Sequence, residues 1–333
     1  MTTSTTGQPA LGVAGGTDET TPSFKGGRDD EQKSGAGGDA PKQRKRSGGG
    51  GEDRHKNAGW FTRIVLGIIC FLWLVPLVGL FITSFRSEQS ANTSGWWSIF
   101  AGGDFGFVGF DNYEQAITDA ELGNAFVNTV AIALPATFIP LLIATFAAYT
   151  FTFMRFPFRD TLFLLLVALL VIPNFVSFVP ILQIYNDFEM SGTYPAVWLA
   201  HIGFGMSLAV YILRNYMSTL PVSVLESAEI DGASHFQTFW RLILPMSMPA
   251  IAAFAIFQFL WVWNDLFVAL VFIGPGENAP ITVAIQNTLL SQQGAGWNLV
   301  TAGGFFSMVV PIIVFLSLQR FFVRGLTAGA VKG

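Results

Sequence analysis

The sequence has 333 residues, of which 51% are hydrophobic and only 12% are charged, and its formal net charge is −4. Average globular proteins contain about 25% charged residues, so this composition argues against a soluble protein. The single cysteine, Cys70, excludes a disulfide or a cysteine metal site within the chain. No Gly-Lys pair occurs, which excludes a G-x-x-x-x-G-K-[ST] phosphate loop. We therefore expect no cofactor, no metal and no ATP hydrolysis by this chain.

Residues 1–58 differ from the rest in composition. They hold nine of the 18 Lys and Arg and eight of the 22 Asp and Glu, with Phe24 as the only aromatic residue. Such a segment cannot bury enough apolar area to offset its ordering entropy, so we predict a disordered cytoplasmic tail. Its basic cluster between Lys42 and Lys56 could attract anionic lipid or nucleic acid. Because acidic residues lie close by, we favour a role in topology alone, without a nucleic-acid partner.

The remaining residues, 59–333, contain six long uncharged stretches. A helix needs roughly 20 apolar residues to cross the hydrocarbon core. The predicted spans lie between Arg63 and Arg86, at 122–154, at 161–186, at 190–213, from about 244 to 273 and from about 297 to 318. The fifth is interrupted only by Asp265. These stretches predict an all-α polytopic membrane protein with six transmembrane helices.

The positions of Lys and Arg predict the orientation, because basic residues are retained on the cytoplasmic side. With both termini cytoplasmic, the inner loops and the tail collect Arg155, Arg159, Arg214, Arg241, Arg320, Arg324 and Lys332, and the outer loops hold only Arg86. The first outer loop, 87–123, contains Trp96 and Trp97, which are typical of an amphipathic segment at the membrane interface.

The inner loop 221–245 has the pattern of two capped helices. Ser223 and Glu226 match the S-x-x-E capping box, which predicts a helix over 224–231 that Gly232 ends, and Ser234 and Gln237 repeat the device. The second helix then places four apolar residues at helical spacing before Pro245 opens the fifth span: Phe236, Phe239, Trp240 and Ile243. We predict a helix, a glycine elbow and a second helix.

The same loop resembles a known motif. Glu226-Ser227-Ala228, three residues, Gly232, nine residues and Leu242-Ile243-Leu244-Pro245 are similar to the E-A-A-x3-G-x9-I-x-L-P loop of ABC importer permeases. Ser227 and Leu242 depart from it. The flanking 230–234 and the tail 319–333 resemble the carbohydrate group, on the side of the second maltose permease subunit, and 213–217 resembles α-glucoside permeases. The resemblance implies the type I ABC importer permease fold.

The resemblance also implies partners and site residues. The expected partners are a second permease subunit, an ATPase dimer, an extracytoplasmic sugar-binding protein and the lipid bilayer. The expected ATPase-coupling residues are Glu226, Ser227, Ala228, Asp231, Gly232, Leu244 and Pro245. In the cytoplasmic tail 320–333, the expected ATPase contacts are Gly325, Leu326, Thr327, Gly329 and Lys332. Glu226 has a competing structural role, since a capping-box glutamate bonds the start of its own helix.

Polar residues within the spans are candidates for the transport path, because they are costly in the membrane. Asn264 and Asp265 lie in the fifth span and Asn128 lies in the second. Structural hydrogen bonds between helices are the alternative, and for Asn128 the favoured one. The outer loop 274–296 is expected either to touch the sugar-binding protein or to be a solvated connection.

The resemblance therefore implies a permease subunit of an ATP-driven carbohydrate importer in the cell membrane. Such a subunit is expected to form half of the sugar path and to couple to a separate ATPase. An ion-coupled secondary transporter is one alternative, and it would carry acidic residues within the membrane and two repeated halves. The predicted spans contain one acidic residue, Asp265, and the sequence shows no internal repeat. A membrane scaffold that transports nothing is the other alternative. The sequence does not name the sugar.

Overall fold

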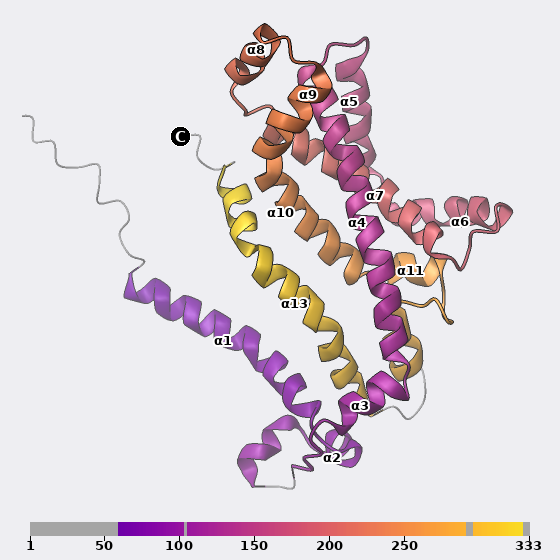
Figure 1. Cartoon of the computed structure of the whole chain (residues 1–333). Coiled ribbons are helices and arrows are strands. Elements are labelled where there is room, and N and C mark those ends of the chain that lie inside the picture. The colour runs from indigo at the N-terminus through magenta and orange to yellow at the C-terminus, as the bar shows by residue number, and fades with distance from the viewer. Residues whose placement is uncertain (1–58, 103–104, 291–295, 329–333) are drawn as a thin grey trace, which may run out of the picture. The chain divides into compact units, whose positions relative to one another are not determined.

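The computed structural model describes residues 59–102, 105–290 and 296–328. The fold lies within the unit Trp60–Gly333 (Figure 1). The predictions made for the tail 1–58 lie outside the described residues. Within the described ranges the chain is helical, and its strand-like pairing is an isolated bridge between Arg86 and Phe107.

Five helices are long and apolar enough to cross a membrane. They are α1 (Trp60–Thr83), α4 (Leu122–Phe153), α7 (Tyr194–Met217), α10 (Leu244–Trp263) and α13 (Trp297–Ala328). α10 is continuous with α9 (His235–Thr238) and the π-helical turn η4 (Phe239–Ile243). Each of these helices matches a predicted span. A long apolar run in lipid is helical because only the helix pairs all of its backbone N–H and C=O groups within the segment.

The third predicted span is not one helix, and this prediction was wrong. It consists of α5 (Arg159–Ala168), η2 (Leu169–Val171), η3 (Asn174–Ser177) and α6 (Phe178–Asp187), and its two halves meet at 95°. The bend lies at Pro173, which has no backbone N–H and forces the preceding Ile172 into an extended conformation, with ψ 120. The span count is therefore five helices, or six if the bent pair crosses as one.

The fifth predicted span ends earlier than expected. α10 stops at Trp263, and the short helix α11 (Phe267–Phe272) follows after a break at residues 264–266. Asp265 thus lies in a break between two helices rather than inside a continuous span. Asn and Asp favour such breaks because their side chains bond to the nearby backbone.

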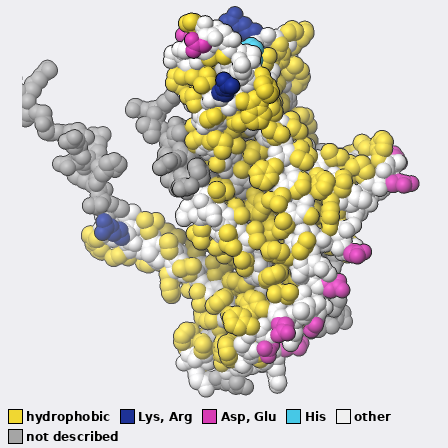
Figure 2. Space-filling model, viewed as in Figure 1, with side chains coloured by type: hydrophobic (Ala, Val, Ile, Leu, Met, Phe, Trp, Pro, Cys, Tyr) yellow, Lys and Arg dark blue, Asp and Glu magenta, His cyan; other side chains and the backbone are white. Residues whose placement is uncertain are grey.

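The core is formed by α4, α7, α10 and α13, which lie side by side in Figure 1. Alanines fill the seam between α4 and α7, and small residues of this kind let two helix backbones approach closely. The fully buried ones are Ala133, Ala136, Ala144, Ala148, Ala196 and Ala209. The outer surface is largely apolar (Figure 2), as expected for a protein that faces lipid or membrane partners.

α1 lies at the margin of this core. Gly79 is its one buried residue, and the helix contacts α13 near its end, where the Phe81 and Phe305 rings lie 5.3 Å apart. Most of its other apolar side chains are exposed along its length.

The two ends of the bundle carry different structures. The elbow end bears α8 (Val222–Ile230) and α9, at the top of Figure 1. The opposite end bears α2 (Glu88–Thr93), η1 (Trp96–Ala101) and α3 (Asp111–Thr118). Between α11 and α13 the chain forms α12 (Ile281–Ala284) and the π-helical η5 (Ile285–Leu290).

Candidate coupling elbow and transport path

The first helix of the elbow begins earlier than the sequence predicted. α8 starts at Val222 after Pro221, so Ser223 lies inside its first turn instead of at the cap position. The N-cap Pro221 makes no side-chain cap hydrogen bond, and Ser223 accepts, through its carbonyl, a 2.8 Å bond from the Ser227 hydroxyl. The predicted capping box of Ser223 and Glu226 is therefore wrong. Proline already sets the backbone angle that a helix start requires.

Gly232 ends α8 as predicted. Its φ of +74 lies in the left-handed region, which glycine adopts without a Cβ penalty. The Ala233 N–H donates to the Ala228 carbonyl at 2.9 Å, and the Gly232 N–H donates to the Glu229 carbonyl at 3.0 Å. These two bonds make a Schellman motif, which satisfies carbonyls at the end of α8 and fixes the direction of the turn.

The second helix of the elbow is capped as predicted. Ser234 accepts from the Gln237 N–H, and Gln237 accepts from the Ser234 N–H, so both halves of the capping box are present. The helix then passes through the π-helical turn η4 into α10 without interruption, so Pro245 lies inside a longer helix and does not open the span.

The predicted apolar stripe on this helix is divided between two faces. Phe239 and Ile243 are buried against the bundle, whereas Phe236 and Trp240 are 69% and 41% exposed. The π-helical turn over 239–243 changes the angle between successive residues, so the regular i, i+3, i+4 spacing does not hold across it. The elbow therefore has one face toward the membrane helices and another toward its surroundings.

An aromatic cluster seats the inner face of the elbow on the end of α4. The Phe239 ring stacks on Phe146 at 4.5 Å and meets Tyr149 edge-on at 5.3 Å. The Tyr149 hydroxyl lies 3.1 Å from His235 Nδ1. Tyr149 is 4% exposed. These contacts join α4 to the elbow, so both α4 and α10 are attached to it.

The predicted coupling residues fall into two groups. Glu226, Ser227, Asp231 and Gly232 are exposed on the elbow, next to the apolar Ile230, which is 85% exposed. Ala228 is buried, Leu244 is half-buried, and Pro245 is exposed within the helix. The exposed group lies on α8 and on the turn that follows it.

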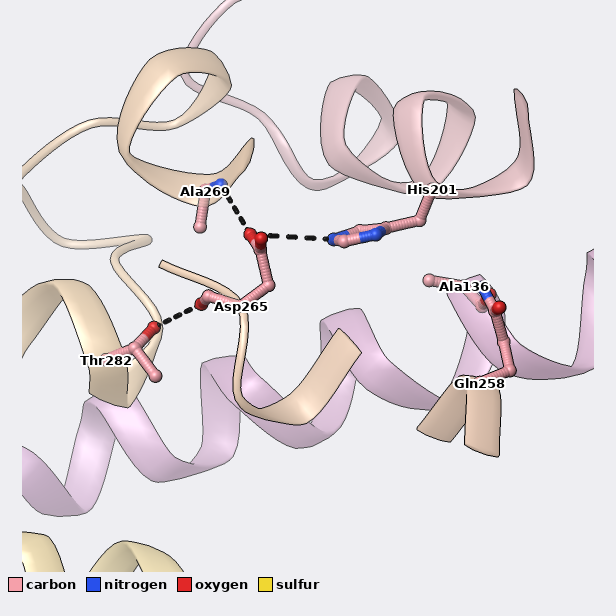
Figure 3. Close-up of polar contacts among 6 residues, drawn as sticks. All are labelled: Ala136, His201, Gln258, Asp265, Ala269 and Thr282. Carbon is pink, nitrogen blue, oxygen red and sulfur yellow. Dashed lines mark hydrogen bonds and ion pairs between the residues drawn. The ribbon is translucent and has the colours of Figure 1, made fainter. Parts of the chain in front are cut away.

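Asn264 and Asp265 stabilise the break between α10 and α11 from either side. Asn264 Nδ2 donates to the Leu260 carbonyl at 2.7 Å and so caps the end of α10. Asp265 Oδ2 accepts from the Ala269 N–H at 3.0 Å at the start of α11 (Figure 3). The Thr282 hydroxyl donates to the Asp265 carbonyl at 2.6 Å. An Asn-Asp pair in an apolar run is a turn signal, and this signal could have predicted the break.

Sequence reasoning missed the buried side chains around this break. His201 on α7 is 1% exposed, and its Nε2 lies 3.8 Å from Asp265 Oδ2 (Figure 3). Gln258 on α10 is fully buried, donates to the Ala136 carbonyl at 3.3 Å and packs against Gly205. Polar residues at 201 and 258 inside apolar spans were the available signal. Among the described residues, no group of three His, Cys, Asp or Glu could hold a metal ion.

Asn128 has well-defined structural partners. Its Nδ2 donates to the carbonyls of Glu277 and Ala279 at 2.8 and 3.0 Å, and its Oδ1 accepts from the Tyr194 hydroxyl at 2.7 Å. Asn128 therefore holds the segment after α11 against α4 and α7. It also lines a cavity of about 510 Å³ at that end, together with Asn124 and Glu277.

The two breaks in the membrane helices meet. The Phe175 ring in η3 meets the Phe267 ring at the start of α11 edge-on at 5.6 Å. Beside the bend, a cavity of about 400 Å³ is lined by the aromatic Phe204 and Trp261 and by polar side chains of Asn174, Ser177 and Ser207.

The predicted tail contacts are described only in part. The backbone of α13 continues as a helix to Ala328, which includes Gly325, Leu326 and Thr327. Gly329 and Lys332 lie outside the described residues.

The comparisons with known proteins identify the family. Residues 140–328 match the family described as binding-protein-dependent transport system inner membrane component. This range includes the elbow, both helix breaks and α13. The chain belongs to this family. It is a multi-pass inner-membrane permease of an ABC importer, and the resemblance found in the 221–245 loop is confirmed.

Curated relatives support the same assignment. The osmoprotective compounds uptake permease protein GgtD of Synechocystis is 48% identical over 81% of this chain and 91% of its own length. The alpha-glucoside transport system permease protein AglG of Rhizobium meliloti is 50% identical over 67% of this chain and 60% of its own. The arabinooligosaccharides transport system permease protein AraQ of Halalkalibacterium halodurans is 31% identical over 82% of this chain and 96% of its own length.

Solved structures share the fold. A chain of a bacterial alginate ABC transporter, crystallised with a periplasmic protein bound to an alginate pentasaccharide, aligns with a TM-score of 0.55. The alignment has 18% sequence identity and covers 79% of this chain and 93% of that chain. The all-α importer permease fold is therefore confirmed.

Proposed function

We propose that this permease imports a carbohydrate of the α-glucoside class and is driven by a separate ATPase that docks on the elbow. The substrate class is supported by the relatives named for α-glucoside and arabinooligosaccharide transport. Docking on the elbow is supported above all by the exposure of Glu226, Ser227, Ile230 and Asp231, which combine two acidic side chains with an apolar one.

The elbow is suited to transmit movement because it is rigid and attached at two points. The Schellman motif and the capping box fix the angle between α8 and α9. One attachment is the continuous helix into α10, and the other is the aromatic seat on Phe146 and Tyr149 of α4. A push on the exposed face of α8 therefore reaches two core helices together, which is the kind of two-state element that coupling requires.

The transport path is proposed to run along the two helix breaks. Non-helical backbone at membrane depth is tolerated only where protein buries it or where it lines a watery cavity. At the bend between α5 and α6, Val171 is 83% exposed and Phe175 is 62% exposed in this chain. This surface must therefore face the path or a second permease subunit. Asn264 and Asp265 lie at the neighbouring break between α10 and α11. We propose that they support the path by holding this break in shape.

The remaining partners follow from what the chain leaves uncovered. A second permease subunit completes the path on the side opposite the bend. An extracytoplasmic sugar-binding protein docks at the end opposite the elbow, where the cavity near Asn124 and Glu277 opens. The ATPase dimer also receives the tail residues Gly325 to Lys332.

Reversing the charge of Glu226 tests the docking proposal. We expect Glu226→Lys to lose ATP-driven uptake in reconstituted importer while the protein still inserts into the membrane, because the exposed carboxylate has no cap bond that folding needs. The matched control is Asp160→Lys, since Asp160 is another exposed acid and lies outside the elbow, with 80% side-chain exposure. Unchanged uptake and unchanged co-purification of the ATPase with Glu226→Lys would show that the docking proposal is wrong.

A further inference from the structure

A buried arginine organises the segment between α1 and α3. Arg86 is fully buried although it lies in a loop. Its guanidinium donates to the carbonyls of Ser90, Ser94 and Phe105, and also to the hydroxyls of Ser94 and Ser98. Burying a charged group is costly unless hydrogen bonds satisfy it, and here the loop wraps around the charge to supply them. Arg86 therefore fixes the shape of residues 88–101.

This shape divides the aromatic residues of η1 between two sides. Trp96 packs on α1, where a Cβ added to Gly79 would lie 2.5 Å from the Trp96 indole nitrogen, so the approach requires glycine. Trp97, Ile99 and Phe100 are 63%, 42% and 80% exposed. The two neighbouring tryptophans thus have different tasks, and Trp97 faces the surroundings.

The position of η1 along α1 gives its depth in the membrane. α1 has 24 residues, which at about 1.5 Å per residue is long enough to cross the bilayer. Gly79 lies one turn before the end of α1 at Thr83, so η1 lies beside the last turn of a membrane span. The exposed side chains of η1 also continue the exposed apolar surface of α1, where Val78 and Phe81 are 45% and 49% exposed.

The composition of the segment fits the same depth. From residue 89 to residue 102 it has no charged side chain, and it combines tryptophan and phenylalanine with serine, asparagine and threonine. Tryptophan is enriched at the membrane–water interface, and Trp and Phe form the apolar face of interfacial segments.

We propose that residues 88–101 form an interfacial anchor that inserts Trp97, Ile99 and Phe100 into the lipid interface at the end of the membrane opposite the elbow, and that Arg86 is the residue that holds the anchor in this conformation. The occupant of the exposed aromatic face is the lipid surface. The anchor fixes the outer end of α1, which otherwise makes few contacts with the core.

The depth of Phe100 can be measured in the assembled importer in nanodiscs. Cys70 is the only cysteine, so Cys70→Ser gives a background for single labels. A nitroxide at Phe100→Cys is expected to be more accessible to oxygen than to a water-soluble nickel chelate. Leu72→Cys in α1 and the exposed Glu114→Cys in α3 give the lipid and water references. Preferential access of nickel to Phe100→Cys would overturn the proposal. Protection from both reagents would also overturn it, since a protein partner would then cover the face.

The role of Arg86 is tested by the same label. Arg86→Gln removes most of the donors and is expected to shift Phe100→Cys toward the water reference while Leu72→Cys keeps its lipid signal. Ser98→Ala removes one hydroxyl acceptor, keeps the guanidinium and is expected to shift Phe100→Cys in the same direction by less, so the test stands even where Arg86→Gln fails to fold. An unchanged oxygen-to-nickel ratio in both variants would show that Arg86 does not hold the anchor.

Discussion

The Asp265 side chain lies closer to the backbone of α11 than to the His201 ring. Its Oδ2 accepts from the Ala269 N–H at 3.0 Å, whereas His201 Nε2 lies 3.8 Å away, which is too long for a direct hydrogen bond. This contact satisfies a backbone N–H in the first turn of α11, and a neutral amide oxygen can make the same contact. The carboxylate is therefore expected to act mainly through its shape and acceptor oxygen.

Two substitutions at Asp265 separate these roles. Asp265→Ala removes the acceptor and is expected to lower the stability of the break by about 1 kcal/mol, the usual net contribution of one intramolecular hydrogen bond. Asp265→Asn keeps an acceptor oxygen and is expected to retain most of that stability. Thermal unfolding of the detergent-solubilised protein measures both. Equal destabilisation by the two variants would show that the negative charge near His201 matters more than this hydrogen bond.

At the scale of the elements, the two helix breaks are the feature that the hydropathy pattern does not predict. Each lies within a run of apolar residues long enough to span the membrane, so an average over the run predicts one helix. Pro173 and the Asn264-Asp265 pair were visible as local breakers, but in membrane helices such residues also occur in continuous spans because neighbouring groups satisfy the backbone. Only packing decides which of these occurs.

The elbow shows both the success and the limit of local patterns. The box of Ser234 and Gln237 could be predicted because both partners lie within one turn. The box of Ser223 and Glu226 has the same spacing, but Pro221 starts the helix first, and the choice between two start signals depends on the preceding chain. The contact of Tyr149 with His235 joins positions 86 residues apart, and a single sequence contains no signal for it.

The exposure of Val171 at the bend gives a direct test of the path. In the Cys70→Ser background, Val171→Cys is expected to react with a membrane-impermeant thiol reagent during ATP-driven turnover, because the broken backbone lines a watery cavity. Leu72→Cys is the control, since Leu72 lies on the exposed apolar surface of α1, which we expect to face lipid, and is expected to stay unreactive. If Val171→Cys were as unreactive as Leu72→Cys in every state of the importer, the bend would be covered by protein and would not line the path.

At the scale of the whole membrane domain, charge is distributed between the two ends. On the face shown in Figure 2, basic side chains lie near the elbow and at the start of α1, whereas acidic side chains gather toward the opposite end, apart from a few on the elbow. Arg86, the exception on the opposite end, is fully buried inside its loop. The positive-inside rule therefore favours an elbow that faces the cytoplasm, which is also where an ATPase would find ATP.

Two aspartates at opposite ends of α4 test this orientation. Asp119 precedes α4 and Asp160 follows it, and both are exposed. In right-side-out vesicles with the Cys70→Ser background, an impermeant maleimide is expected to label Asp119→Cys at once and Asp160→Cys only after detergent opens the membrane, because one bilayer crossing separates them. The reverse order would place the elbow outside. Because ATP is present inside the cell, an ATPase could not then dock on the elbow. That result would show that the proposed coupling of docking to transport is wrong.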